Sequence, residues 1–323
     1  MKLLFVFTGG TIGSAASGAY IGLDGKHPRR LLQKYAERYG DPGPYDTAEP
    51  CTLLSENSTG RTLRSILVCV RQAASRYDGI VVTHGTDTLA YTAAALAYTL
   101  GSGCVPVCVV SAGLPPEDPA SNGPDHLHAA LRLIQAGRRG VWVPYRSGNG
   151  PVRVYPGARV PASLPFTDAL CGPAAGQFGP AWSYRRDPAF RPAPDGQPPL
   201  PADRLTETAA RILRVEPYPG MVYPAVPAAV RYVLHGSYHS GTVGTATRQT
   251  ITFMQKMARR GVRVYLTGVG DGTQYESTAA FAQLGVRPLP RLMPAAAYIK
   301  LWLADRAGLD PDAVLPVPLS GAL

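Results

Sequence analysis

The fold is decided near the start of the chain by the stretch Leu3-Leu4-Phe5-Val6-Phe7-Thr8-Gly9-Gly10-Thr11-Ile12-Gly13. Its first five residues are apolar without interruption, which is typical of a parallel strand covered on both faces. Hydroxyl groups and glycines follow at once, and glycine lets a backbone turn sharply and approach a ligand closely. Because open α/β sheets bind ligands at the carboxyl ends of their strands, we expect a site at Thr8 and Thr11.

A second segment has the same plan. The run Gly79-Ile80-Val81-Val82-Thr83 is followed by His84-Gly85-Thr86-Asp87-Thr88, and an alanine-rich helical stretch begins at Leu89. Taken alone, Thr86 or Asp87 is best explained as the N-cap of that helix, because both residue types accept backbone N–H bonds there. A catalytic role needs a neighbouring base or charge relay, since a threonine hydroxyl is a weak nucleophile. Threonines at two strand ends, with a carboxylate beside one of them, are suitable groups for acyl transfer.

The rest of the chain alternates strands and helices, which predicts an α/β fold with a mostly parallel sheet. Helices are expected at 28–39, 61–77, 89–100, 124–135, 248–259 and 294–303, and strands at 3–7, 51–54, 79–83, 105–110, 141–143, 211–215, 232–236 and 262–267. From 182 to 202 the composition changes to Pro, Arg, Asp and Gly, which favours a linker. We therefore expect two α/β domains: a larger catalytic domain over 1–182, a linker over 183–205 and a smaller domain over 206–323.

The composition is that of an ordinary globular protein, with 45% hydrophobic and 17% charged residues. No run of about 18 apolar residues marks a membrane span. The first residues carry one charge and then enter a strand, so no signal peptide is expected. The five cysteines are odd in number and lack metal-ligand spacing, which suits a reducing compartment. We expect a cytoplasmic protein with no metal and no membrane partner.

The formal net charge of +10 raises nucleic-acid binding as an alternative, because basic surfaces bind phosphates with little sequence demand. The basic residues occur in separated pairs such as Arg29-Arg30, Arg138-Arg139 and Arg259-Arg260. No basic run with interleaved aromatic residues stands out along the sequence. A solvated basic surface is the favoured explanation, and no nucleic-acid partner is expected.

Two further patterns suggest cofactors only weakly. Gly9-Gly10-x-x-Gly13 follows a strand as a dinucleotide loop does, but the full glycine fingerprint is missing and no acidic residue ends a second strand at the required place. The pairs His126-x-His128 and His235-x-x-x-His239 have spacings that a metal could use, but no carboxylate or cysteine cluster completes either set. We expect no cofactor.

The two glycine–threonine motifs resemble the signature motifs of the bacterial-type L-asparaginase and glutaminase-asparaginase family. Thr8-Gly9-Gly10-Thr11-Ile12 and Thr83-His84-Gly85-Thr86-Asp87-Thr88-Leu89 occur in the family's order and about the expected distance apart. Ser55-Glu56-Asn57 between them is similar to the family's substrate-binding turn, and Ser121-Asn122-Gly123-Pro124 to its Ala-Asp-Gly-Pro segment. Landmarks of the type I, cytosolic members extend the resemblance over nearly the whole chain: Tyr218-Pro219-Gly220, Leu234-His235-Gly236-Ser237-Tyr238 and Pro294-Ala295-Ala296-Ala297-Tyr298-Ile299-Lys300-Leu301.

The resemblance implies an amidohydrolase that splits the side-chain amide of L-asparagine, or a related amide, into a carboxylate and ammonia without metal or cofactor. By the family pattern Thr11 is the nucleophile and Tyr20 helps to orient it. Thr86 and Asp87 belong to a second catalytic group that activates water or the nucleophile.

The same resemblance assigns the groups that hold the amino acid. The Ser55 hydroxyl faces the substrate carboxylate, while Glu56 and Asp87 face its ammonium. Charge complementarity alone gives the same polarity, because an ammonium needs acceptors and a carboxylate needs donors. A homodimer or homotetramer is also implied.

One departure from the family pattern matters more than those at Leu114-Pro115-Pro116-Glu117-Asp118, which replaces an Arg-Pro stretch, and at Ala295, where type I members often have glutamate. The family places a lysine beside the second threonine, in a segment of the form Arg-x-Val-Thr-Lys, whereas the matching segment here is Ala158-Arg159-Val160-Pro161-Ala162-Ser163. Ala162 stands at the lysine position, and no lysine occurs between Lys34 and Lys256. A buried lysine can accept a proton, whereas alanine cannot and arginine stays protonated. The alternatives are a weakly active or inactive member that binds an amino acid, or an enzyme for a modified or peptide-borne amide.

Overall fold

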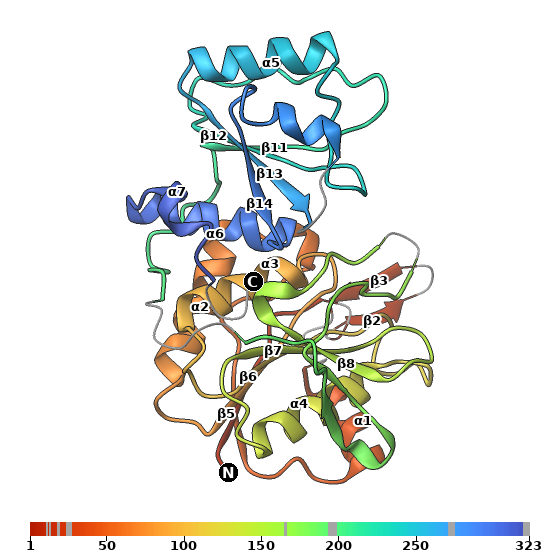
Figure 1. Ribbon diagram of the computed structural model, residues 1–323. Helices are drawn as coiled ribbons and strands as arrows, with labels where there is room; N and C mark the ends of the chain where they lie inside the picture. The colour runs from red at the N-terminus through yellow and green to blue at the C-terminus, as the bar shows by residue number, and fades with distance from the viewer. Residues whose placement is uncertain are drawn as a thin grey trace. The chain divides into compact units, whose positions relative to one another are not determined.

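The computed structural model describes residues 1–10, 12, 14–17, 20–23, 28–164, 167–192, 199–270 and 275–318 (Figure 1). For residues 14–17, 20–23, 28 and 29 it describes the backbone. The chain forms two compact units, Met1–Glu207 and Thr208–Val317. Each unit has its own sheet and its own hydrophobic core.

The first unit is built on an eight-stranded sheet with the order β10-β9-β8-β7-β6-β5-β1-β4. Its parallel part consists of β4 (Tyr45–Ala48), β1 (Leu3–Val6), β5 (Gly79–Thr83), β6 (Val107–Val110) and β7 (Val141–Arg146). Every residue of β1, β5 and β6 is buried, because strands covered on both faces are apolar without alternation. The predicted α/β class with a mostly parallel sheet is confirmed.

Four helices cover this sheet: α1 (Pro28–Tyr39), α2 (Gly60–Ala73), α3 (Leu89–Leu100) and α4 (Gly123–Gln135). Helices α1 and α4 lie side by side in Figure 1, and Leu31 and Leu127 pack in one core cluster with Phe5 of β1. Helix α2 begins at a capping box between Thr59 and Thr62, which satisfies backbone N–H groups at its first turn. Helix α3 is buried almost all round, which explains its alanine-rich composition.

The other end of the sheet is antiparallel and was not predicted. It consists of β8 (Val152–Pro156), β9 (Gly176–Phe178) and β10 (Tyr184–Arg186). Strand β10 lies inside the segment 183–205, for which the composition favoured a linker, and that segment falls within the first unit. An edge strand needs no apolar run, so β10 carries no strand signal in its composition.

The expected strand at 51–54 is wrong. These residues form no strand and contribute one bridge, between Gly9 and Leu53. The sheet ends instead at β4, within a stretch rich in Pro, Gly and Asp. Tyr45, Asp46 and Thr47 of β4 are exposed, so this edge strand also lacks the apolar signal of a buried one.

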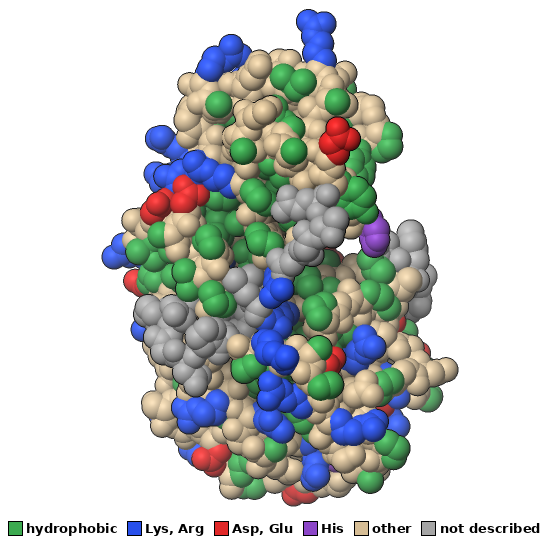
Figure 2. Space-filling view, in the orientation of Figure 1, with side chains coloured by type: hydrophobic (Ala, Val, Ile, Leu, Met, Phe, Trp, Pro, Cys, Tyr) green, Lys and Arg blue, Asp and Glu red, His purple; other side chains and the backbone are tan. Residues whose placement is uncertain are grey.

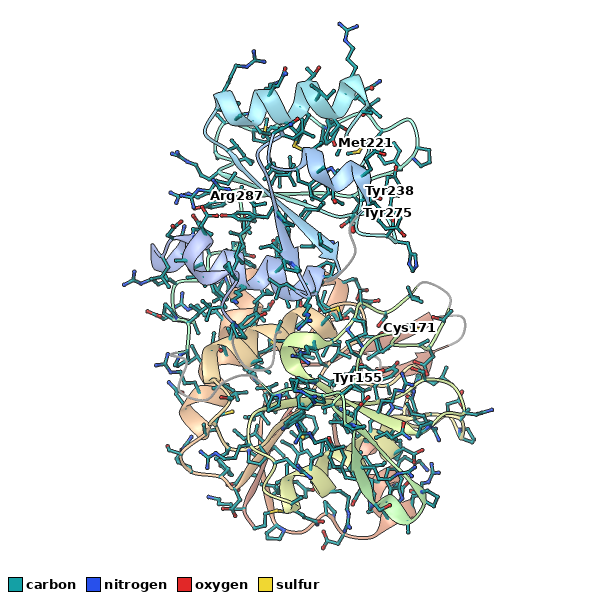
Figure 3. All side chains as sticks on the ribbon, in the orientation of Figure 1. Tyr155, Cys171, Met221, Tyr238, Tyr275 and Arg287 are labelled. Carbon is teal, nitrogen blue, oxygen red and sulfur yellow. The ribbon has the colours of Figure 1, made fainter. Side chains whose placement is uncertain are left out.

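The second unit has a four-stranded parallel sheet with the order β11 (Ile212–Val215), β12 (Tyr232–His235), β13 (Arg263–Val269) and β14 (Val286–Pro290). Its helices are α5 (Arg248–Arg259), α6 (Pro294–Ala307) and α7 (Pro311–Val314). Arg287 on β14, labelled in Figure 3, donates to Asp312, and the Tyr265 hydroxyl donates to the same carboxylate at 2.8 Å. These contacts fasten α7 to two strands.

Within the described ranges, no helix is both long and apolar enough to cross a membrane.

Candidate functional site

Parallel pairing brings the two glycine–threonine motifs together. Strands β1 and β5 are neighbours with Val6 opposite Val82, so both motifs leave the sheet at the same edge. Thr8 is buried, and its Oγ1 donates to the carbonyl oxygen of Thr83 at 2.6 Å. This hydrogen bond ties the end of β1 to the end of β5.

Two glycines let the motifs approach at backbone distance. A Cβ atom on Gly10 would lie 2.4 Å from the Cα of Gly85, and a Cβ on Gly85 would lie 2.4 Å from Oγ of Ser55. Gly10 also has a φ of +76°, a conformation that side chains with a Cβ rarely adopt. Larger residues at either position would separate the two loops.

The short helix η2 (Ser55–Asn57) completes the site from a third segment. The loop before it is fixed to the first motif, because Leu53 N donates to Thr8 O at 3.1 Å and Gly10 N donates to Leu53 O at 3.0 Å. Ser55 is buried, and its Oγ donates to Oδ2 of Asp87 at 3.1 Å. The structure thus brings together Ser55 and Asp87, two residues that the sequence assigned to substrate binding.

The N-cap explanation for Thr86 or Asp87 is wrong. The N-cap of α3 is Thr88, and no side chain caps this helix. The Thr88 hydroxyl donates to the carbonyl oxygen of Ser55 at 3.0 Å instead. The Asp87 carboxylate is therefore directed to the Ser55 hydroxyl and not to the first turn of α3. Thr86 is half-buried, and Asp87 and Glu56 are exposed.

His84 is held as a neutral structural residue. The Gly85 carbonyl oxygen lies 2.8 Å from its Nδ1, so Nδ1 carries the proton and donates. Nε2 then accepts from the Thr92 hydroxyl at 2.8 Å. Burial lowers the pKa of His84, which favours this neutral form. Both ring nitrogens have partners, so His84 offers no lone pair to a substrate.

The segment that contains Ala162 lies beside the second motif. Ser163 Oγ donates to the carbonyl oxygen of Thr86 at 3.4 Å, and Ala162 is exposed. The Tyr155 hydroxyl fixes the far side of this segment by donating to Leu170 O at 2.9 Å, next to Cys171 (Figure 3). The match of Ala162 to the family's lysine position stays a prediction.

Several residues that anchor the site were not singled out by the sequence. Asp168 accepts from Asn122 Nδ2 at 2.7 Å and from the Tyr145 hydroxyl, so it fixes the loop that follows Ser163. Only the Asn122 segment gave a signal, through its resemblance to the family's Ala-Asp-Gly-Pro segment. The Asp168 contacts join residues far apart in the chain, and no spacing rule indicates them.

The side chains of two predicted catalytic residues lie outside what the structure describes. Thr11 lies outside the described residues, between Gly10 and the buried Ile12. Tyr20 is described as the first backbone position of β3 (Tyr20–Leu23), which pairs with β2 (Ser14–Ser17). The roles of Thr11 and Tyr20 stay predictions.

Two of the histidines with metal-like spacing have other partners. His126 is buried; its Nδ1 donates to Ser111 O at 2.7 Å, and its Nε2 accepts from Arg146 N at 2.7 Å. His235 Nδ1 donates to Gly236 O, and the Tyr223 hydroxyl lies 3.1 Å from its Nε2. In the part of the chain that the structure describes, no three His, Cys, Asp or Glu side chains are grouped to hold a metal ion.

Known proteins share this sequence and fold. Residues 2–160 match the family model described as Asparaginase, N-terminal. L-asparaginase 1 of Escherichia coli is 30% identical over 336 residues, which cover 97% of this chain and 94% of that protein. An L-asparaginase of Thermococcus kodakarensis is 36% identical over 147 residues, covering 45% of this chain and 44% of that protein. The solved structure of the thermostable L-asparaginase from Thermococcus kodakarensis superposes with a TM-score of 0.81 at 26% identity, over 100% of this chain and 99% of that one. The chain therefore belongs to the asparaginase family of amidohydrolases.

Proposed function

We propose that this chain hydrolyses the side-chain amide of L-asparagine, or of a closely related amide, through a threonine nucleophile. The observation that carries the proposal is the pairing of Ser55 of η2 with Asp87 of the motif that follows β5. Asp87 and Glu56 provide carboxylates for a substrate ammonium, and the Ser55 hydroxyl can turn to donate to a substrate carboxylate. An α-amino acid needs this arrangement of opposite charges.

In the proposed reaction the Thr11 hydroxyl oxygen attacks the amide carbon, and the C–N bond breaks as the nitrogen gains a proton and leaves as ammonia. The product is an ester between Thr11 and the acyl group. Water then attacks this ester and the C–O bond to Thr11 breaks. One proton of the water restores the Thr11 hydroxyl and the other is taken up by the released ammonia, so a carboxylate leaves. Thr86, at the end of β5, belongs to the group that relays the protons, and Tyr20 orients Thr11.

A second candidate is a weakly active or silent member that binds an amino acid, or an enzyme for a modified or peptide-borne amide. The region around Thr86 supports it, because the neighbouring hydroxyl of Ser163 and methyl of Ala162 cannot accept a proton near neutral pH. Lys2 and Lys34 pair with Asp46 and Glu37, away from the strand ends that form the site.

Ammonia release from L-Asn, L-Gln, D-Asn and an asparaginyl peptide separates the hydrolase from the silent member, and release from the peptide alone assigns the peptide-borne amide. We expect release from at least one of these amides, and we expect Thr11→Ala to lower kcat by about 10³-fold, because the covalent route is then closed. Binding of aspartate or asparagine with no ammonia release from any of the four would support the silent candidate and contradict the hydrolase.

The missing lysine is tested with Ala162→Lys on free L-Asn. If a proton acceptor is what the site lacks, kcat increases by about 10²-fold, which is the low end of what a positioned base contributes. Leu164→Lys is the matched control, because Leu164 lies on the same loop with 50% of its surface exposed. Equal kcat values for the two lysine variants would contradict this explanation for a weak native enzyme.

We also propose a cytoplasmic homodimer or homotetramer, on the family resemblance alone. Light scattering of the purified protein measures the assembly, and a monomer at micromolar concentration would contradict it.

A further inference from the structure

Arginine side chains gather at the antiparallel end of the eight-stranded sheet. From Arg138 to Arg191 the sequence contains eight arginines and only two acidic residues, Asp168 and Asp187. Figure 2 shows Lys and Arg side chains in a line over the first unit, with few Asp or Glu side chains beside them. Five of the eight arginines form what we call the arginine cluster: Arg138, Arg139, Arg159, Arg186 and Arg191. All five are exposed except Arg159, which is half-buried.

Phe190 lies at the centre of the arginine cluster. The guanidinium carbons of Arg159 and Arg186 lie 5.3 and 5.6 Å from the centroid of its ring. Two positive charges share one aromatic side chain, although Arg159 and Arg186 are far apart in the sequence. A guanidinium held over a ring keeps N–H groups at its edge, where they can donate to a phosphate.

Two other aromatic residues, Tyr184 and Trp142, position Arg138 and Arg139. The guanidinium of Arg138 lies 4.7 Å from the centroid of the Tyr184 ring. The indole Nε1 of Trp142 donates at 3.0 Å to the carbonyl oxygens of Arg138 and Arg139, and the Trp142 ring lies 6.5 Å from that of Phe190. The loop that follows α4 is thereby held beside β10, the edge strand of the sheet.

Neutral acceptors hold three of these guanidinium groups. Arg186 and Arg191 donate to backbone carbonyl oxygens of the 188–190 loop at 2.9 and 2.7 Å, and Arg139 donates to Gly103 O at 2.8 Å. The ion pairs formed between described residues do not include Arg138, Arg139, Arg186 or Arg191. The guanidinium groups of Arg139, Arg186 and Arg191 are therefore held in position by backbone carbonyl groups, which do not neutralise their charges.

We propose that the arginine cluster binds the phosphate backbone of a single-stranded nucleic acid. Exposed like charges repel, so their collection on one surface is favoured by an anionic ligand. They come from the loop after α4, from η3 (Gly157–Arg159), from β10 and from the loop after β10. An extended polyanion, which carries many charges, is the ligand that such a set of separate segments fits best. Single-strand binding relies on a basic surface that follows the phosphate backbone, and the half-buried rings of Tyr184 and Phe190 hold guanidinium groups of this cluster in place.

A membrane surface fits this cluster less well. Trp142, Tyr184 and Phe190 are not among the exposed large apolar side chains of the described residues. The cluster therefore offers charge without an apolar side chain that could enter the acyl region of a bilayer.

Arg185 provides a control on the same strand. Arg185 and Arg186 are consecutive residues of β10, and both pair with β9: Arg185 is opposite Gln177, and Arg186 is opposite Gly176. Consecutive side chains of a strand point to opposite faces of the sheet. Arg185 therefore lies on the face away from Arg186 and from the rest of the cluster.

The test is fluorescence anisotropy with a labelled oligouridylate of about 16 nucleotides, near the upper site size of single-strand binding folds. Salt is varied from about 50 to 300 mM to obtain the slope of log K against log salt. The cluster variant carries Arg138→Gln, Arg186→Gln and Arg191→Gln. The control variant carries Arg185→Gln with Arg64→Gln and Arg71→Gln on α2, all exposed, so both lose the same charge.

We expect the native protein to bind and the cluster variant to bind at least tenfold more weakly. Its salt slope should be shallower by about 2, since each phosphate contact to a single strand contributes about 0.7. The control variant should stay within twofold of native, and an oligodeoxythymidylate of the same length should show the same order of affinities. Unchanged thermal unfolding and unchanged ammonia release show that the cluster variant is folded.

Three results would overturn the proposal. One is no binding of the oligouridylate by the native protein at about 50 mM salt and about 100 μM protein, since sequence-independent binding to phosphates has a Kd of about 100 μM or lower. Another is an equal loss in the cluster and control variants, which would mean that net charge alone is responsible. The third is binding to phosphatidylserine–phosphatidylcholine vesicles without binding to the oligonucleotide, which would assign the cluster to a membrane surface.

Discussion

The candidate site and the arginine cluster belong to one unit and are built in opposite ways. The site is acidic and hydroxyl-rich, and its groups are fixed by hydrogen bonds of 2.6 Å from Thr8 to Thr83 and 3.1 Å from Ser55 to Asp87. The arginine cluster is basic and exposed, and aromatic rings hold its guanidinium groups at 4.7 to 5.6 Å. Chemistry on one small molecule needs short fixed distances, whereas binding an extended polyanion needs charge density. Short motifs specify the first, and residues spread along the chain provide the second.

The largest expected effect comes from removing the charge of Asp87, which should change catalysis at the candidate site and leave binding at the arginine cluster almost unchanged. On the proposed role of Asp87 in binding the substrate ammonium, Asp87→Asn should lower kcat/KM by about 10³-fold, as expected when one partner of a charge pair is removed. Ammonia release measures this, and the affinity for the oligouridylate should change less than twofold.

Asp187→Asn is the matched control, because Asp187 is exposed in the loop after β10 and makes the same change of charge beside the arginine cluster. It should leave kcat/KM unchanged. Retention of native kcat/KM by Asp87→Asn would remove Asp87 from substrate binding.

The close approach of the loops in the site is tested by Gly10→Ala, with an expected loss of about 3 kcal/mol in the free energy of unfolding. About 1 kcal/mol of this comes from the positive φ, and the rest from a Cβ placed 2.4 Å from Gly85 Cα. Gly40→Ala is the control, because Gly40 has a φ of +86° with nothing within 4 Å of an added Cβ. Its loss should be about 1 kcal/mol. Urea unfolding measures both, and equal losses would show that the close approach has no energetic effect.

The smallest expected effect is on the pH dependence of the free energy of unfolding, to which the buried Lys300 of the second unit should contribute and the exposed arginine cluster should not. Lys300 has 0% of its surface exposed and donates to the carbonyl oxygens of Leu315 and Val317. Desolvation lowers its pKa from 10.5 to about 7. Between these values the unfolded chain binds one proton more than the folded one, so stability rises with pH.

We expect unfolding in urea to become harder by about 2 kcal/mol from pH 7 to pH 9 through this group. This contribution is lost again as the pH falls back through 7. In Lys300→Met the difference between pH 7 and pH 9 should shrink by that amount, while Arg186→Gln, which removes an exposed charge, should leave it unchanged. Equal pH dependence in native and Lys300→Met would contradict the lowered pKa.

The sequence alone determined the elements whose signals are local. The helices at 28–39, 89–100 and 248–259 begin and end where their patterns predicted. The apolar runs of β1 and β5 predicted two buried parallel strands, and with them the edge of the sheet at which the two motifs lie. Buried strands and amphipathic helices carry such signals because the hydrophobic effect acts on each segment's own side chains.

Only the tertiary structure decided the edges of the sheet and what gathers there. Strands β4 and β10 are exposed edge strands, so nothing in their composition required a strand. The pair of Ser55 with Asp87 and the meeting of Arg159 with Arg186 over Phe190 depend on strand order and register. Register is set by the packing of the whole sheet, and contacts between distant residues follow from it.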